Sequence, residues 1–425
     1  MNIKCDTTFH NVGQGMFYSG CIYNKESEFS FVYDCGTHSS QKFISWEIED
    51  FHWSMKRCNN ILNLLVLSHF DGDHVNQLDK LLSELQVETI VIPYVDPIER
   101  LIISLKYPYE LDSYYEFLSD PINYLLDKGV KQIIVMGGDK TSNEVILEDK
   151  LYDLVDNELN ITLRDDNEFK NNVLNKELIE RTEKLLFKTH DGFIIFKNLW
   201  LFRFFNYSCD QVEIDEFYKL LKAEGYDVSS TEKIIEIVVD KVKRRKLKKI
   251  YKKVWEINNT SIIMFHGPLP RNVISDNYVF NERQHICANE KKYRNITKRH
   301  CYNLYSHYKF DRVSIVHQQN LSGTILFGDI TLRSCYKEII KHFKHFLNSI
   351  LIVQVPHHGS SNSWSKEILD DINDFSFWIV PFGIYNRYNH PDNNIISKIN
   401  ELSPSKIVIP NTECHKIYIK SSVQL

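Results

Sequence analysis

The part of the sequence that decides the fold is the heptapeptide Ser68-His69-Phe70-Asp71-Gly72-Asp73-His74. It directly follows Leu62–Leu67, an unbroken apolar run that is typical of a strand buried on both faces. A tight loop after such a strand can point several imidazole and carboxylate groups at one place, and these groups together suit Zn, Mn or Fe. Alternatively, one aspartate caps the helix that we expect from Val75, but a cap needs only one such residue. We therefore predict a metal site here.

Three further polar clusters also stand directly after expected strands. They are Asp329 after Thr324–Phe327, His357 with His358 after Ile350–Val355, and His390 after Phe377–Val380. Taken alone, Asp329 is more typical of a turn, and His390 of a surface loop. An α/β fold, however, gathers the ends of successive strands at one edge, so we expect all four clusters to meet. Adjacent histidines point in different directions, so we expect one of His357 and His358 to bind metal and the other to support it or contact substrate.

Strand and helix patterns alternate in the first third of the chain and again in its last third. The first part includes a helix pattern over Pro121–Lys128 and a strand pattern over Gln132–Met136. The alternation returns with the apolar run Ser261–Phe265. This order of elements predicts an α/β fold.

The middle of the chain interrupts this alternation. It is polar and helix-prone, with one apolar section at Phe193–Phe205 and one long helix expected over Thr231–Val254. Because the polar clusters fall on both sides of it, one split domain fits better than two consecutive domains. We predict a first half over residues 1–139, a large, mostly helical insertion over residues 140–256, and a second half over residues 257–425.

Composition indicates a globular protein of the cytoplasm. Of 425 residues, 43% are hydrophobic and 25% are charged, which is ordinary for a chain with a real core. The nine cysteines form no C-x-x-C pair, and the N-terminus lacks the pattern of a secretory signal, so we expect reduced thiols. The longest apolar runs, such as Ile61–Leu67, are too short to cross a bilayer, so we expect no membrane contact.

The heptapeptide resembles the H-x-[HD]-x-D-H motif of the metallo-β-lactamase superfamily, in its H-x-D-x-D-H form. The ordered set of motifs is more similar to the metallo-hydrolase domain of the ComEC/Rec2 competence proteins. That family carries D-V-G-Q-G-D, D-x-G, S-H-x-D-x-D-H, G-D, H-H-G-S and G-H-P elements. Here they correspond to His10–Met16, Asp34–Gly36, Ser68–His74, Gly328-Asp329, His357–Ser360 and Asn389–Pro391. The resemblance covers roughly residues 8–138 and 257–412.

The resemblance implies an αββα sandwich with two divalent metal ions, Zn or Mn, at one edge. It assigns His69 and Asp71 to the first metal, Asp73 and His74 to the second, Asp329 to a bridge between them, and His358 or else His357 to the completion of the second site. Asp34 is expected to support the site from behind through hydrogen bonds. His390 is expected at the rim, to contact a phosphate or protonate a leaving group, and with Asp73 it is a predicted catalytic residue.

The chain departs from the family pattern in three places. Asn11 and Met16 replace both aspartates of the first motif, so that motif is expected to be structural here. Asp71 stands where many relatives have histidine, which makes the site harder and more tolerant of Mn. Asn258 and Asn259 stand where many members have a further histidine ligand. We therefore expect the first metal site to be weak or empty, and a one-metal or inactive relative is the alternative.

A divalent metal lowers the pKa of a bound water to about 7 and thereby makes a nucleophile for hydrolysis. The resemblance implies that the bond cleaved is a phosphodiester. Without the membrane channel of the competence proteins, the chain is expected to be a bacterial effector, in phage defence by analogy. Nine of the 13 residues 241–253 are Lys or Arg, and a second basic patch lies within residues 291–300. The residues expected to contact nucleic acid are Lys243, Arg244, Arg245, Lys248 and Lys249.

Other functions stay open at this point. Charge runs are usually solvated helix faces, and Leu247, Ile250, Tyr251 and Val254 supply a buried stripe at helical spacing. A peptidase or small-ester hydrolase with the same metals would not need the basic residues. A degenerate fold would serve as an interaction module, with a protein partner docked on the insertion. The sequence contains no serine-hydrolase elbow, P-loop or dinucleotide fingerprint that would favour another class.

Overall fold

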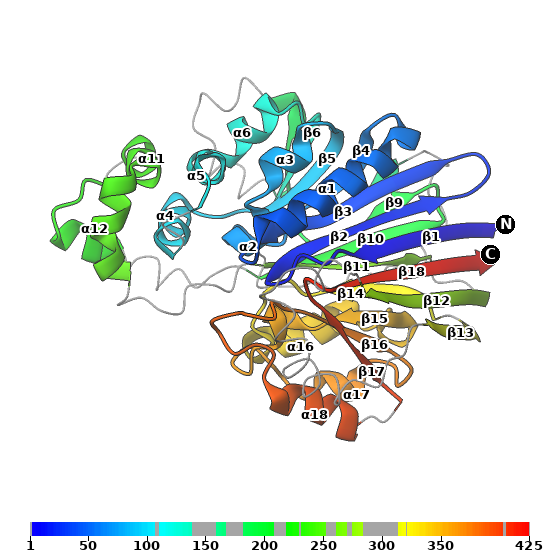
Figure 1. The fold of residues 1–425 in the computed structure, drawn as a ribbon. Helices are drawn as coiled ribbons and strands as arrows, with labels where there is room; N and C mark the ends of the chain where they lie inside the picture. Colours follow the sequence, from blue (N-terminus) through cyan, green and yellow to red (C-terminus); the bar gives the residue numbers. More distant parts are fainter. Residues whose placement is uncertain are drawn as a thin grey trace.

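Two mixed β-sheets lie face to face at the centre of the protein, and helices cover their outer faces (Figure 1). The structure is a computed structural model. It describes residues 2–106, 110–137, 159–166, 182–207, 218–228, 231–251, 261–269, 274–283, 313–319, 321–402 and 405–424. The predicted α/β class is confirmed.

The first sheet has ten strands in the described residues. In spatial order they are β13 (Val313–Gln319), β12 (Ile274–Arg283), β18 (His415–Gln424), β1 (Asn2–Phe9), β2 (Gly15–Tyr23), β3 (Glu28–Thr37), β4 (Ile61–Val66), β5 (Gln86–Pro93), β6 (Gln132–Met136) and β8 (Leu185–Lys188). The strands from β3 to β8 run parallel, and the other neighbours are antiparallel. Tyr33 lies opposite Val66, so the chain leaves β4 beside Asp34 of β3.

The second sheet has eight strands in the part of the chain that the structure describes. In spatial order they are β17 (Ile407–Asn411), β16 (Phe377–Pro381), β15 (Ile350–Gln354), β14 (Gly323–Leu326), β11 (Ser261–Pro268), β10 (Trp200–Tyr207), β9 (Ile194–Phe196) and β7 (Leu159–Ile161). β14 to β17 run parallel. Their carboxyl ends therefore lie at one edge of the sheet, as expected for the clusters at Asp329 and His357-His358.

The described helices pack either on the outer faces of the sheets or mainly against other helices. They are α1 (Gln41–Met55), α2 (Gly72–Val75), α3 (Leu78–Leu82), α4 (Pro97–Lys106), α5 (Asp112–Ser119), α6 (Pro121–Asp127), α11 (Thr231–Val239), α12 (Lys241–Tyr251), α16 (Leu332–Phe343), α17 (Ile368–Asp371) and α18 (Asn393–Leu402). Short 3-10 helices lie at Lys56–Cys58, Thr182–Lys184, Leu347–Ser349 and Pro356–Gly359. Among the described residues, no helix has both the length and the apolar character needed to cross a membrane.

Three large hydrophobic cores among the described residues hold four layers together in the order helix, sheet, sheet, helix (Figure 1). The first core lies between α1 and the first sheet and includes Ile44 and Leu65. The second lies between the sheets, where the rings of Phe31 and Phe202 are 5.1 Å apart. The third lies between the second sheet and α16 and includes Ile339. Burial of apolar side chains on both faces of each sheet explains why the parallel strands are continuous hydrophobic runs.

The prediction of a mostly helical insertion over residues 140–256 is not confirmed. The described residues of this region include β8, which extends the first sheet, and β7, β9 and β10, which extend the second. The apolar section Phe193–Phe205 is therefore part of the central sheets, since β10 pairs with β11 along its whole length. Strands of three or four residues are too short to show a period of two, which is why the sequence did not reveal β7 to β9. The division of the chain into three parts stays a prediction.

The helical end of this region packs against α4 and α5 (Figure 1). The prediction of one helix over Thr231–Val254 is wrong within the described residues, because α11 ends at Val239 and α12 begins at Lys241. Asp240 between them accepts hydrogen bonds from the backbone nitrogens of Val242 (2.7 Å) and Lys243 (3.0 Å). Such an aspartate caps the start of a new helix, so the chain changes direction here.

Candidate metal centre

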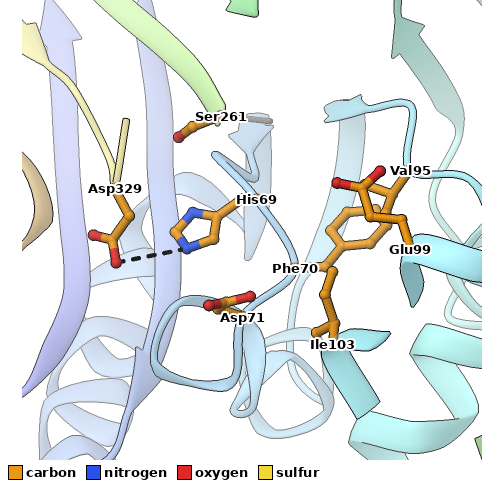
Figure 2. Close-up of a pocket in the computed structure, with 8 residues that line it drawn as sticks. All are labelled: His69, Phe70, Asp71, Val95, Glu99, Ile103, Ser261 and Asp329. Atoms are coloured by element: carbon orange, nitrogen blue, oxygen red, sulfur yellow. Dashed lines mark ion pairs between the residues drawn. The ribbon is translucent and has the colours of Figure 1, made fainter. Parts of the chain in front are cut away.

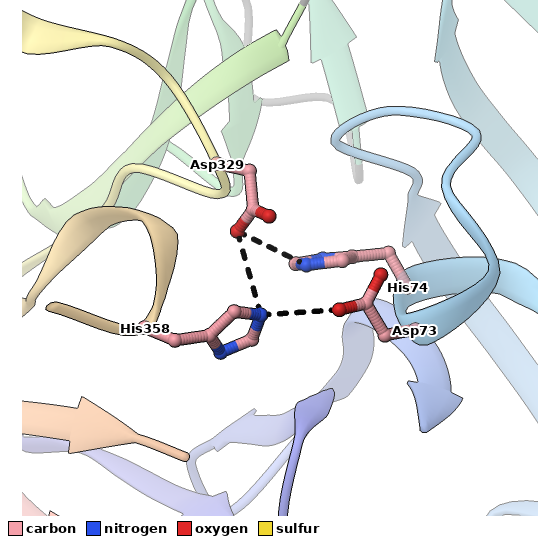
Figure 3. Close-up of side chains that lie close together, drawn as sticks. All are labelled: Asp73, His74, Asp329 and His358. Carbon is pink, nitrogen blue, oxygen red and sulfur yellow. Dashed lines mark hydrogen bonds and ion pairs between the residues drawn. The ribbon is translucent and has the colours of Figure 1, made fainter. Parts of the chain in front are cut away.

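Four buried side chains from three distant segments converge at the edge where the two sheets meet (Figure 3). They are Asp73 and His74 in α2, Asp329 after β14, and His358 after β15. Their ligand atoms lie within 4.8 Å of one another. Nε2 of His74 is 3.2 Å from Asp329 Oδ1, and Nε2 of His358 is 3.3 Å from Asp73 Oδ2 and 3.7 Å from Asp329 Oδ1. The structure thus brings together the predicted ligands of the second metal and the predicted bridge.

Each histidine of this cluster is held through its other ring nitrogen. Nδ1 of His74 lies 2.8 Å from Asp34 Oδ2, and Nδ1 of His358 lies 3.0 Å from the carbonyl oxygen of Pro381. A carboxylate or carbonyl oxygen only accepts, so both Nδ1 atoms carry the proton when the ring is neutral. Both Nε2 lone pairs then face the cluster, which is the arrangement of metal-binding histidines.

Asp34 supports the centre from behind, with the hydrogen bonds that we expected. Its carboxylate accepts from the backbone nitrogen of Ser68 (2.6 Å), from the Ser68 hydroxyl (2.6 Å) and from His74. Asp34 has φ 58°, a conformation that is costly for residues other than glycine. This backbone conformation directs the carboxylate of Asp34 toward His74.

We expect Asp34→Asn to weaken metal binding about 10- to 100-fold, the usual effect of removing a residue that orients a ligand. An asparagine has one acceptor oxygen where three donors converge, so His74 loses its fixed orientation. Competition with a chelating dye measures the affinity for Mn²⁺ or Zn²⁺. The matched control is Asp370→Asn on the exposed face of α17, which should leave the affinity unchanged. Equal affinity in both variants would contradict this role.

The residues of the cluster fit a cation. Among the described residues, His74 Nε2, Asp73 Oδ1 and Asp329 Oδ1 are buried without a hydrogen-bond partner. Burial raises the pKa of the Asp329 carboxyl, but His357, His74 and His358 together hold it well below its ordinary value. Burial lowers the pKa of His74, but Asp329 and Asp34 raise it well above its ordinary value. The cluster therefore favours positive charge at its centre, and a divalent ion would replace protons there.

His69 and Asp71 lie beside this cluster and, together with Asp329 of the cluster, line a small cavity (Figure 2). Nδ1 of His69 is 2.8 Å from the hydroxyl oxygen of Ser68, and its Nε2 is 3.9 Å from Asp329 Oδ2. Asp71 forms an ion pair with Lys106, whose Nζ is 2.9 Å from Asp71 Oδ2. The cavity measures about 10 Å³, which is room for one water-sized group. The two residues predicted for the first metal are thus outside the four-residue cluster.

Two further predicted residues lie at the rim. Nε2 of His357 is 3.7 Å from Asp329 Oδ2, but its side chain is 33% exposed and its Nδ1 is 2.8 Å from the Ser363 hydroxyl. Of the two adjacent histidines, His358 is the one in the cluster. The ring of His390 is 5.7 Å from that of His357 and 6.4 Å from that of His358.

The charge of His390 does not fit the role of a proton donor. Burial and the neighbouring His358 and His357 lower its pKa to about 4. A neutral imidazole at pH 7 can accept a proton or donate one weak hydrogen bond, but it has no acidic proton to give a leaving group. The expected contact with a phosphate would then be through a neutral N–H group.

Sequence reasoning missed three charged residues around the centre. Nδ1 of His38 is 3.5 Å from Asp73 Oδ2, and its Nε2 is 3.2 Å from Glu110 Oε1. Burial lowers the pKa of His38, but Asp73 and Glu110 raise it above its ordinary value. His38 directly follows β3, so the argument from strand ends could have found it. Glu110 and Lys106 come from the segment before α5 and from α4, and nothing in the sequence links them to the site.

The first two motifs of the resemblance have a structural role in the described residues. A β carbon at Gly36 would lie 2.6 Å from the backbone of His74, and one at Gly15 would lie 2.7 Å from the backbone oxygen of Asp73. Glycine at both positions lets β2 and β3 approach the loop that carries the cluster. Gln14 also accepts a hydrogen bond from the backbone nitrogen of Gly383 (3.2 Å), which ties the first motif to the second sheet.

A second buried group, His190, Asp191 and His342, could also hold a metal ion by distance. The charged residues around this group argue against a bound metal ion. His342 Nε2 donates to the carbonyl oxygen of Phe204 (2.7 Å), and its Nδ1 faces the guanidinium of Arg203 at 3.5 Å. Asp191 forms an ion pair with Arg164 (3.0 Å). Two arginines already supply positive charge beside this group, which disfavours a metal ion there.

The predicted nucleic-acid contacts are only partly on the surface. Arg244 is buried: it donates hydrogen bonds to the carbonyl oxygens of Val238 and Val239 and lies 3.4 Å from the ring centre of Tyr115. This packing removes Arg244 from the predicted set, since a buried guanidinium cannot reach a phosphate backbone. Arg245 is exposed and Lys243 is partly exposed. The side chains of Lys248 and Lys249, the patch within residues 291–300, and Asn258 and Asn259 lie outside the described residues.

Comparison with known proteins does not assign the chain to a family. No family model matches the chain, and no curated protein matches it. The resemblance to the metallo-hydrolase domain of ComEC/Rec2 proteins therefore stays a prediction that rests on the motifs quoted above.

Proposed function

We propose that this protein is a divalent-metal-dependent hydrolase of the metallo-β-lactamase fold that cleaves phosphodiester bonds in nucleic acid. The observation that carries the proposal is the convergence of Asp73, His74, Asp329 and His358 in one buried cluster. Two imidazole nitrogens and two carboxylates are a donor set that suits Zn or Mn. The cluster stands where strands of two facing sheets end, which is the arrangement that the resemblance implies.

Each residue has a defined part in this proposal. Asp73, His74, Asp329 and His358 would hold the metal, and Asp34 and the carbonyl of Pro381 orient the two histidines. A bound divalent ion polarises a phosphoryl oxygen and lowers the pKa of a water to about 7. His390 at the rim, with its lowered pKa, is suited to accept a hydrogen bond from a water or to contact substrate as a neutral ring. A role in phage defence rests on fold-level analogy alone.

One observation favours a second function, hydrolysis of a small ester or a peptide. The burial of Arg244 reduces the basic surface on which nucleic-acid binding depends. An enzyme acting on another bond would use the same cluster and would not need that surface. Neutralising Lys243 and Arg245 therefore separates the two proposals: it should lower cleavage of nucleic acid by weakening phosphate contacts, and it should leave hydrolysis of a small ester unchanged.

The proposal is tested with purified protein and linear DNA, circular DNA and single-stranded RNA, in the presence of Mn²⁺, Zn²⁺ or Mg²⁺. Cleavage is expected with the wild type and is expected to disappear in the double variant Asp73→Ala/His74→Ala. The control Asp370→Asn should cleave like the wild type. Bound metal without cleavage of any nucleic acid would favour the second function. Absence of both metal and cleavage would leave an interaction module.

A further inference from the structure

Lys106 forms an ion pair with a residue that the resemblance assigns to a first metal ion. It is the last residue of α4, and its Nζ is 2.9 Å from Oδ2 of Asp71, a residue assigned to that metal. The pair is well shielded from water, since the side chains are 16% and 4% exposed. An ammonium in this position supplies to Asp71 the positive charge that the ion would supply.

Geometry leaves little room for a second cation. A metal ion bound to a carboxylate oxygen lies about 2.0 to 2.2 Å from it. An ion on the same oxygen of Asp71 would thus lie within about 5 Å of the Lys106 ammonium, in a site with little water to screen their repulsion. The polar residues that line the neighbouring cavity are His69, Asp71, Glu99, Ser261 and Asp329, and its volume of about 10 Å³ holds no more than one water-sized group, so an ion there would have no space for a water ligand beside it.

We propose that Lys106 takes the place of the first metal ion, so that the centre binds one divalent cation, held by Asp73, His74, Asp329 and His358. This inference rests on the proposed metal-dependent function. It changes the roles of two residues. Asp71 anchors α4 through Lys106. His69 contacts Ser68 through Nδ1, and its buried Nε2, which has no hydrogen-bond partner among the described residues, lies beside a water-sized cavity instead of a second ion.

The test is the number of ions bound per chain, measured by equilibrium dialysis against Mn²⁺ or Zn²⁺ followed by elemental analysis. The wild type should bind one ion. Lys106→Met should bind two, because the buried Asp71 carboxylate accepts a metal ion once the Lys106 ammonium is removed. Lys131→Met, an exposed lysine with an ion pair to Glu88, is the matched control and should bind one.

Two ions in the wild type, or one ion in a folded Lys106→Met, would overturn the inference. His69→Ala tests it independently of whether Lys106→Met folds: the variant should keep one ion with an affinity within about 3-fold of the wild type. Loss of an ion in His69→Ala would also overturn it. An absence of metal from every protein is a different result, because it would contradict the proposed function itself.

Discussion

Replacing Asp329 by asparagine is expected to weaken metal binding by about 100-fold or more and to abolish metal-dependent hydrolysis. Asp329 lies close to four histidines of the centre, two on each of its oxygens. Its Oδ1 is 3.2 Å from His74 and 3.7 Å from His358, and its Oδ2 is 3.9 Å from His69 and 3.7 Å from His357. The substitution removes the charge of a carboxylate whose two oxygens face different histidines. Changes to residues that only orient ligands cost about 10- to 100-fold, so a ligand should cost at least the upper end of that range.

Isothermal titration with Mn²⁺ or Zn²⁺ measures this effect, and far-ultraviolet circular dichroism checks that the variant is folded. Asp370→Asn is again the matched control, because the same substitution on an exposed helix face removes the same charge far from the cluster. A folded Asp329→Asn that binds metal as tightly as the control would show that Asp329 is not a ligand.

The largest expected effect on stability is that of Lys416→Met. Lys416 is buried in β18, and its Nζ is 2.8 Å from Glu47 and 2.7 Å from Asp50, both in α1. Glu47 also lies 2.7 Å from Nδ1 of His10. Burial raises the pKa of Glu47, but His10 and Lys416 hold it below its ordinary value. The variant leaves this carboxylate buried without its lysine, which is expected to lower the free energy of unfolding by about 3 to 5 kcal/mol.

Urea denaturation followed by circular dichroism measures the free energy of unfolding. Lys420→Met lies on the same strand with an exposed side chain, and it should change stability by no more than about 0.5 kcal/mol. The double variant Glu47→Gln/Lys416→Met should recover part of the loss, because it also removes the negative charge that Lys416 balances. Equal stability of Lys416→Met and Lys420→Met would contradict the importance of this buried ion pair.

Much of the central fold could be predicted because its parallel strands are continuous apolar runs. Gln132–Met136 was predicted as a strand with the bounds that β6 has, and the helix expected over Pro121–Lys128 differs from α6 by one residue. The predicted ligands Asp73, His74, Asp329 and His358 meet because strand ends gather at one edge. The spacing of these residues along the chain and the topology of a parallel sheet were enough to predict that the four side chains meet.

The remaining features depend on contacts between distant segments. The strands β8 and β9 contain four and three residues, too few for a pattern, and their place is fixed only by pairing with β6 and β10. The burial of Arg244 depends on the position of Tyr115. Lys106 reaches Asp71 only because α4 packs beside the loop, 35 residues along the chain. Sequence periodicity carries no information on such pairs.

The most direct test of the central claim is an anomalous difference map from crystals of the protein grown with Mn²⁺ or Zn²⁺, measured at the absorption edge of the metal. One strong peak is expected, bounded by Asp73, His74, Asp329 and His358 and about 2.0 to 2.2 Å from their ligand atoms. A map without a peak at these residues, or with its strongest peak at His190, Asp191 and His342, would contradict the proposed metal centre.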